Sequence, residues 1–210
     1  MAQSIALIGD SIFDNAGYVP GEPDVAEQLR GMTPNDVDVT LLAVDGDFVA
    51  DVSRQIQRIP QETTHLFVSA GGNDALSYAQ EMLHQFENAA EMFYEWAKIQ
   101  REFRSEYRDM LASVAALNRK AALCTIYDAV PSIDEIEMTG LSLFNDVIVS
   151  ETIAAGLPLV DLRHVCTEVD DYSRLSPIEP SCAGGAKIAA VLHRLFTEHD
   201  FSSRQTVVYC

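Results

Sequence analysis

The sequence has few basic residues for its length, with 14 lysines and arginines against 32 aspartates and glutamates. The resulting formal net charge of -18 opposes binding to nucleic-acid phosphates or to anionic lipid, because both would be repelled. Long hydrophobic runs are also missing, since no apolar stretch approaches the roughly 18 residues that a membrane span requires. We therefore expect no nucleic-acid partner and no membrane partner, and without a signal-like segment we expect a cytoplasmic protein.

Recognisable metal and cofactor motifs are missing as well. The four cysteines have no C-x-x-C spacing, so they form no zinc-ribbon or dithiol pattern. Carboxylate pairs such as Asp36 and Asp38 have no histidine or third carboxylate to complete a set of metal ligands. Glycine motifs for phosphate or dinucleotide binding do not occur. We predict that the protein works without a cofactor.

Short apolar and β-branched segments alternate with helical patterns along the chain. This alternation favours a parallel sheet that is covered by helices on both faces. Candidate strands lie at residues 4–8, 37–44, 65–70, 121–127 and 158–162, and candidate helices at residues 25–30, 48–59, 141–155 and 184–197. No linker rich in Pro, Gly or Ser divides the 210 residues, so we expect one domain over residues 1–210.

The longest segment without a strand, residues 76–119, carries aromatic and apolar side chains at helical spacings. The polar residues 100–102 interrupt this pattern and predict either two helices or one long bent helix. Most of the apolar stripe is expected to pack in the core. Because the segment directly follows the third strand, it could also shape a substrate pocket at the sheet edge.

Glycine and polar residues follow the first three predicted strands. Parallel strands direct their carboxyl ends to one edge of the sheet, so these residues would converge there. They are Gly9-Asp10-Ser11, Asp45-Gly46 and Gly71-Gly72-Asn73-Asp74. Ser11 would present its hydroxyl as a nucleophile, and its own N–H, the N–H of Gly46 and the Asn73 amide would stabilise an oxyanion.

In these motifs the chain resembles the SGNH (GDSL-type) hydrolases over nearly its whole length. The resemblance implies a flavodoxin-like, three-layer α/β/α fold with a five-stranded parallel sheet and a helical insertion after the third strand. It implies Ser11 as the nucleophile, with Ser11, Gly46 and Asn73 as the oxyanion hole. The partner would be a small-molecule ester, and homo-oligomerisation is left open. Asp10 and Asp74 are expected to support the loops of the matched motifs.

The sequence departs from the family's Asp-x-x-His motif before the last helix. Aligned on Pro180 and that helix, Glu179 takes the histidine position and Ser176 the aspartate position. The ordinary pKa of glutamate is about two units below that of histidine, but burial raises a carboxyl pKa by up to about 3 to 5 units. We therefore predict Glu179 as the general base, with Ser176 as a supporting residue.

A literal Asp-x-x-His occurs at Asp161-Leu162-Arg163-His164, where neither a proline nor an immediate helix follows. His164 is therefore an alternative base, or a strand-end histidine bonded to nearby backbone. The main hypothesis is a serine esterase or acyl hydrolase. The alternatives are a binding or scaffold protein that has lost turnover, and an acyltransferase that uses the same serine.

Overall fold

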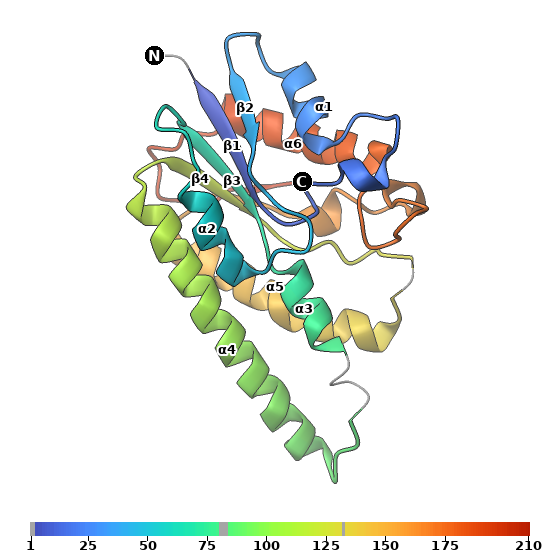
Figure 1. Ribbon diagram of the computed structural model, residues 1–210. Coiled ribbons are helices and arrows are strands. Elements are labelled where there is room, and N and C mark those ends of the chain that lie inside the picture. Colours follow the sequence, from blue (N-terminus) through green and yellow to red (C-terminus); the bar gives the residue numbers. More distant parts are fainter. Residues whose placement is uncertain (1–2, 80–83, 132) are drawn as a thin grey trace.

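A parallel sheet forms the centre of the computed structural model, which describes residues 3–79, 84–131 and 133–210 (Figure 1). Its strands are β1 (Ser4–Gly9), β2 (Asp38–Leu41), β3 (His65–Ser69), β4 (Lys120–Cys124), β5 (Leu159–Val160) and β6 (Val208–Tyr209). Their order is β2-β1-β3-β4-β5-β6, and every neighbouring pair is parallel. The predicted fold class is confirmed. The expected count of five strands was wrong, because within the described residues β6 adds a sixth strand beside β5.

Helices cover both faces of the sheet (Figure 1). The first face packs against α1 (Val25–Met32) and α6 (Cys182–Glu198), and the second against α2 (Val52–Ile56), α4 (Ala89–Ala116) and α5 (Glu135–Ala155). Residues of β1 alternate between the two layers: Ile5 and Leu7 join the first core, and Ala6 and Ile8 the second. A strand that is buried on both faces explains the continuous apolar run near the start of the sequence.

In the described part of the segment after β3, the chain forms a short helix, α3 (Gly72–Ser77), and one long helix, α4. The helix α4 continues through the polar residues 100–102, because this part of the helix contacts polar groups on α5. The Gln100 side chain donates to the Leu143 carbonyl at 3.1 Å, and Arg104 forms an ion pair with Glu151 at 2.6 Å. Most of the described apolar stripe is core, although Phe93 is 67% exposed. Met82 lies outside the described residues.

Two glycines allow the turns that bring the strand ends together. Gly9 has φ of +128°, and a Cβ atom at this position would lie 1.7 Å from the carbonyl oxygen of Ser69. The ends of β1 and β3 can therefore approach closely, immediately before Ser11. Gly46, with φ of +84°, turns the loop after β2 in the left-handed region that favours glycine.

Polar caps determine where the later helices begin. The Ser181 hydroxyl accepts the Gly184 N–H at 3.1 Å and starts α6 three residues after Glu179. Asp134 and Glu137 form a capping box at the start of α5. None of the helices in the described parts of the chain is both long and apolar enough to cross a bilayer.

Candidate active site

Ser11 and Glu179 line the same cavity, which has a volume of about 110 Å³. Ser11 lies two residues after the end of β1, and Glu179 lies three residues before α6, so residues that are distant in sequence meet at the carboxyl edge of the sheet. Both are buried, with exposed fractions of 7% and 5%. The Ser11 hydroxyl lies close enough to the Glu179 carboxylate to lower its pKa. One oxygen of this carboxylate, Oε2, is buried without a hydrogen-bond partner among the described residues.

Burial changes the protonation of two carboxyl groups at this cavity. Burial is the main reason why the pKa of Glu179 rises from 4.5 to about 7. The interaction with the Ser11 hydroxyl opposes this rise, and the negative charge of Asp45 adds to it. Burial also raises the pKa of Asp10 to about 8, where the Ile12 N–H opposes the rise and Glu179 adds to it. Burial therefore shifts both groups toward the protonated form relative to a solvent-exposed carboxyl group.

Hydrogen bonds hold the backbone on both sides of Glu179. The Tyr127 hydroxyl donates to the Ile178 carbonyl at 2.6 Å, and the Asn15 side chain donates to the Pro180 carbonyl at 3.1 Å. The Glu179 carbonyl accepts the Ser173 N–H at 2.8 Å. These bonds orient the segment that carries Glu179 without engaging its carboxylate.

Ser176 supports this segment through its backbone, because its carbonyl accepts the Glu179 N–H at 3.0 Å. Its hydroxyl has no hydrogen-bond partner within the described ranges. Ser176 therefore does not orient the base through its side chain, as an aspartate would orient a histidine.

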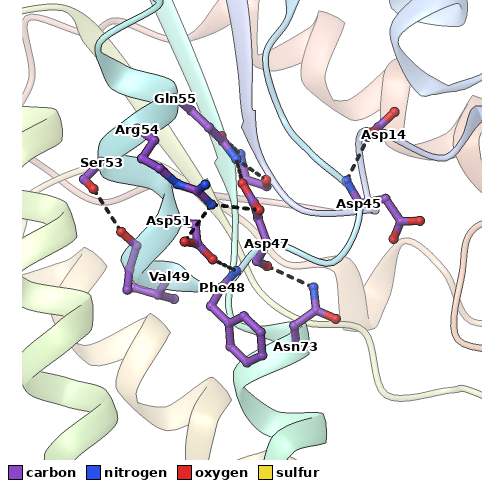
Figure 2. Close-up of polar contacts among 12 residues, drawn as sticks. Asp14, Asp45, Asp47, Phe48, Val49, Asp51, Ser53, Arg54, Gln55 and Asn73 are labelled. Atoms are coloured by element: carbon purple, nitrogen blue, oxygen red, sulfur yellow. Dashed lines mark hydrogen bonds and ion pairs between the residues drawn. The ribbon is translucent and has the colours of Figure 1, made fainter.

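The three predicted oxyanion donors lie on neighbouring turns. The Asn73 side chain lines the cavity and donates one of its two N–H groups to the Asp47 carbonyl at 2.9 Å, as Figure 2 shows. The backbone N–H groups of Ser11 and Gly46 have no hydrogen-bond acceptor in the described part of the chain. Gly46 lies on an exposed loop just before Asp47, outside the cavity wall.

Asp10 and Asp74 both bind backbone groups of adjacent loops. One oxygen of Asp10 accepts the Ile12 N–H at 3.2 Å, and its carboxyl group also interacts with the Gly72 N–H. Asp74 of α3 accepts the Val49 N–H at 3.1 Å, which joins α3 to the loop after β2. Both groups therefore brace the turns around the cavity.

Gln55 is a site residue that our reading of the sequence did not identify. Its buried side-chain amide accepts the Gly9 N–H and donates to the Gly9 carbonyl, both at 2.7 Å, and also donates to Asp47 at 2.9 Å. One amide thus connects the turn before Ser11 to the loop that holds Asn73 (Figure 2). Its spacing in the sequence could have identified it. Gln55 lies three residues after Val52, and residues three apart share one face of a helix, here the buried face of α2.

His164 lies apart from this cavity. It is exposed and lines a separate surface depression with Lys187, Arg194 and Cys210. Asp161 of the same motif is paired with Arg163 at 2.6 Å and accepts the Thr125 hydroxyl at 3.0 Å. The alternative in which His164 acts as the base of Ser11 is therefore not supported by its position.

Comparison with known proteins assigns the class of the chain. The GDSL-like lipase/acylhydrolase family matches residues 7–184, so the chain belongs to this family. The match includes all three strand-end turns and the segment around Glu179. Family membership supports an ester hydrolase in general. The comparison with curated proteins found no match.

Several solved structures share the fold at low sequence identity. A lipase from a goat rumen metagenome has a TM-score of 0.69 and 18% identity, over 96% of this chain and 100% of the other. An acetyl xylan esterase from Geobacillus stearothermophilus has a TM-score of 0.66 and 16% identity, over 94% and 95%. A lipase/acylhydrolase from Enterococcus faecalis has a TM-score of 0.66 and 20% identity, over 91% and 94%.

Replacing Gln55 by leucine should destabilise the protein by about 1 to 3 kcal/mol, because the Gly9 N–H would be buried without an acceptor, whereas the Gly9 carbonyl would keep the Val44 N–H. Chemical denaturation gives the free energy of unfolding directly. Ser53→Ala, an exposed change on the same helix, is the matched control and should stay within about 0.5 kcal/mol of the wild type. A Gln55→Leu protein as stable as the control would contradict the bracing role of Gln55.

Proposed function

We propose that this protein is a serine esterase that hydrolyses small esters through an acyl-enzyme on Ser11, with Glu179 as the general base. The observation that carries this proposal is the contact between the Ser11 hydroxyl and the buried Glu179 carboxylate at the wall of one cavity. Family membership supports ester hydrolysis in general, and the similar solved structures named above are lipases and esterases. The mechanism uses no cofactor.

In the acylation step, the Ser11 oxygen attacks the ester carbonyl carbon while its proton moves to Glu179. The tetrahedral intermediate then collapses, the bond to the alcohol breaks, and Glu179 returns the proton to the departing oxygen. Water repeats the same sequence on the acyl-enzyme and releases the acid. A carboxylate with a pKa of about 7 suits both directions, because it accepts and returns a proton near neutral pH.

The negative charge that develops on the carbonyl oxygen needs donors that are already oriented. We assign this role to the N–H groups of Ser11 and Gly46 and to the second N–H of the Asn73 amide. Their availability supports the assignment, because the two backbone groups have no other acceptor in the described part of the chain. Loss of one such donor typically costs a factor of about 10² to 10³ in rate.

Asp10, Asp74 and Ser176 act as supporting residues in this proposal. Asp10 holds the Ile12 N–H in the turn at Ser11, and Asp74 holds the Val49 N–H in the loop after β2. A protonated Asp10 also limits the negative charge beside Glu179, which allows Glu179 to ionise. Ser176 supports the base through the backbone bond to Glu179.

Short-chain aryl esters test the two catalytic roles. Ser11→Ala should lose at least about 10⁴-fold in kcat/KM, because it removes the nucleophile. Glu179→Gln should lose about 10² to 10⁴-fold, because it keeps the shape of the side chain but cannot accept the proton. Equal rates in the wild type and both variants would eliminate the mechanism.

A fluorophosphonate separates this proposal from its rivals. Stoichiometric labelling of wild-type Ser11, together with turnover of the esters, is expected for an esterase. Inert Ser11 would favour a binding or scaffold protein. Preferential formation of new esters when an alcohol is added would favour an acyltransferase.

Hydrolysis should increase as the pH rises through about 7. Below that pH the carboxylate of Glu179 is protonated and cannot act as a base, since its pKa is raised from 4.5 to about 7. We expect kcat/KM, measured from pH 5 to 8.5, to have its acidic limb near this value, while the fluorescence of the only tryptophan, Trp96, monitors folding. An acidic limb near 4.5 in a folded protein would contradict the assignment of Glu179.

A further inference from the structure

The wall of the cavity beyond the polar site residues is largely apolar. Leu76 contributes from α3, Ile126 and Val130 from the segment after β4, and Leu141 and Phe144 from α5. Helices α3 and α5 pack against each other at the carboxyl edge of the sheet (Figure 1). No residue of α4 lines the cavity. Of the segment 76–119, which was expected to shape a substrate pocket, only the part next to α3 does so among the described residues.

The polar groups within this apolar wall are already engaged. The Tyr127 hydroxyl donates to the Ile178 carbonyl at 2.6 Å. The Glu137 carboxylate accepts the Asp134 N–H at 2.9 Å in the capping box of α5. A hydroxylated or charged group that entered the pocket would lose much of its water against a mainly apolar wall, which is costly.

The wall is also held in position by contacts behind it. The buried side chain of Asn145 accepts the Ile126 N–H and donates to the Ile126 carbonyl, both at 2.9 Å. The Phe144 ring packs edge-on against Phe103, with ring centroids 4.9 Å apart. Both contacts keep the apolar wall in place without a ligand, so the pocket is formed in advance.

The volume of the cavity limits what fits. An engineered apolar cavity of roughly 150 Å³ binds benzene, which has six carbon atoms, so a cavity of about 110 Å³ suits a group of about four carbons. The ester carbonyl must lie at Ser11, and the apolar wall then extends away from it beneath α5.

We propose that this pocket binds the acyl chain of the substrate and selects apolar acyl groups of about four carbons, with Leu141 of α5 as a specificity-determining residue. This inference rests on the proposed function, because it uses Ser11 as the point at which the acyl group is attached. The alcohol part of the ester then lies outside the apolar pocket.

A series of p-nitrophenyl esters with two, four, six and eight acyl carbons measures this selectivity. Each buried methylene contributes roughly fourfold in binding, so the butyryl ester, with two more methylenes, should exceed the acetyl ester by about fifteenfold in kcat/KM. The octanoyl ester should be at least tenfold poorer than the butyryl ester, because its chain exceeds the cavity. A flat profile, or one that rises to eight carbons, would overturn the inference.

Variants of Leu141, which is half-buried, test its role. Leu141→Trp should reduce the butyryl rate at least tenfold and change the acetyl rate less than threefold. Leu141→Ala should shift the optimum to six carbons, and keeps the test valid if the tryptophan variant does not fold. Ile153 lies on the same helix, is 55% exposed and does not line the cavity, so Ile153→Trp and Ile153→Ala are the matched controls. Unchanged selectivity in both Leu141 variants would contradict the proposal.

Binding to the Ser11→Ala protein distinguishes failure of the pocket from failure of the catalytic mechanism. Ligand-detected NMR with acetamide, butyramide and octanamide needs no turnover, and butyramide should bind best. If the wild type hydrolyses no ester but this preference is present and is lost in Leu141→Trp, the pocket is supported and the catalytic proposal fails. If esters are hydrolysed but neither rate nor binding depends on chain length, the esterase stands and the pocket assignment fails.

Discussion

A buried carboxylate without a positive partner lies beside the Ser11 hydroxyl, and the surrounding structure holds both groups there. Within the described residues, no lysine or arginine forms an ion pair with Glu179. An ionised carboxylate in this setting is destabilised by burial and by Asp45, so its affinity for a proton rises. In the proposed mechanism, this environment lets Glu179 take the role of the histidine in the Asp-x-x-His motif.

The acidic surroundings that raise the pKa of Glu179 also extend to the exposed side of the site. Asp45 accepts a hydrogen bond from the Tyr18 hydroxyl at 2.8 Å, and this bond is the main reason why the pKa of Tyr18 rises to about 12. Asp14 in turn accepts the Asp45 N–H at 2.9 Å (Figure 2). A glutamate base requires no aspartate to select its tautomer, which a histidine does require, so a serine at position 176 is compatible with the mechanism.

The sequence predicts the elements whose signal is local. The apolar run before Gly9 and the turns at Gly46 and Asn73 follow from strand ends in a parallel sheet, and the structure contains these turns at one edge. Glu179 could be identified because Pro180 and the following helix anchor its segment. Its contact with Ser11 could not be derived locally, since it depends on how α6 packs against α1 and the sheet.

Other features depend on tertiary contacts that a linear pattern does not contain. Strand β6 has only two residues and exists through its pairing with β5, so its β-branched sequence alone did not predict it. Gln55 acts through three hydrogen bonds to Gly9 and Asp47, which only the folded chain brings together. The cavity wall likewise combines residues of α3 and α5 that are more than sixty positions apart.

The titration of Glu179 itself tests the central claim most directly. Infrared spectra of protein with ¹³C-labelled glutamate side chains, taken as the difference between the wild type and Glu179→Gln, isolate the carboxyl band of this residue. The account predicts a pKa of about 7, and a higher value in Ser11→Ala because the Ser11 hydrogen bond lowers it. A pKa near 4.5 that does not respond to Ser11→Ala would contradict it.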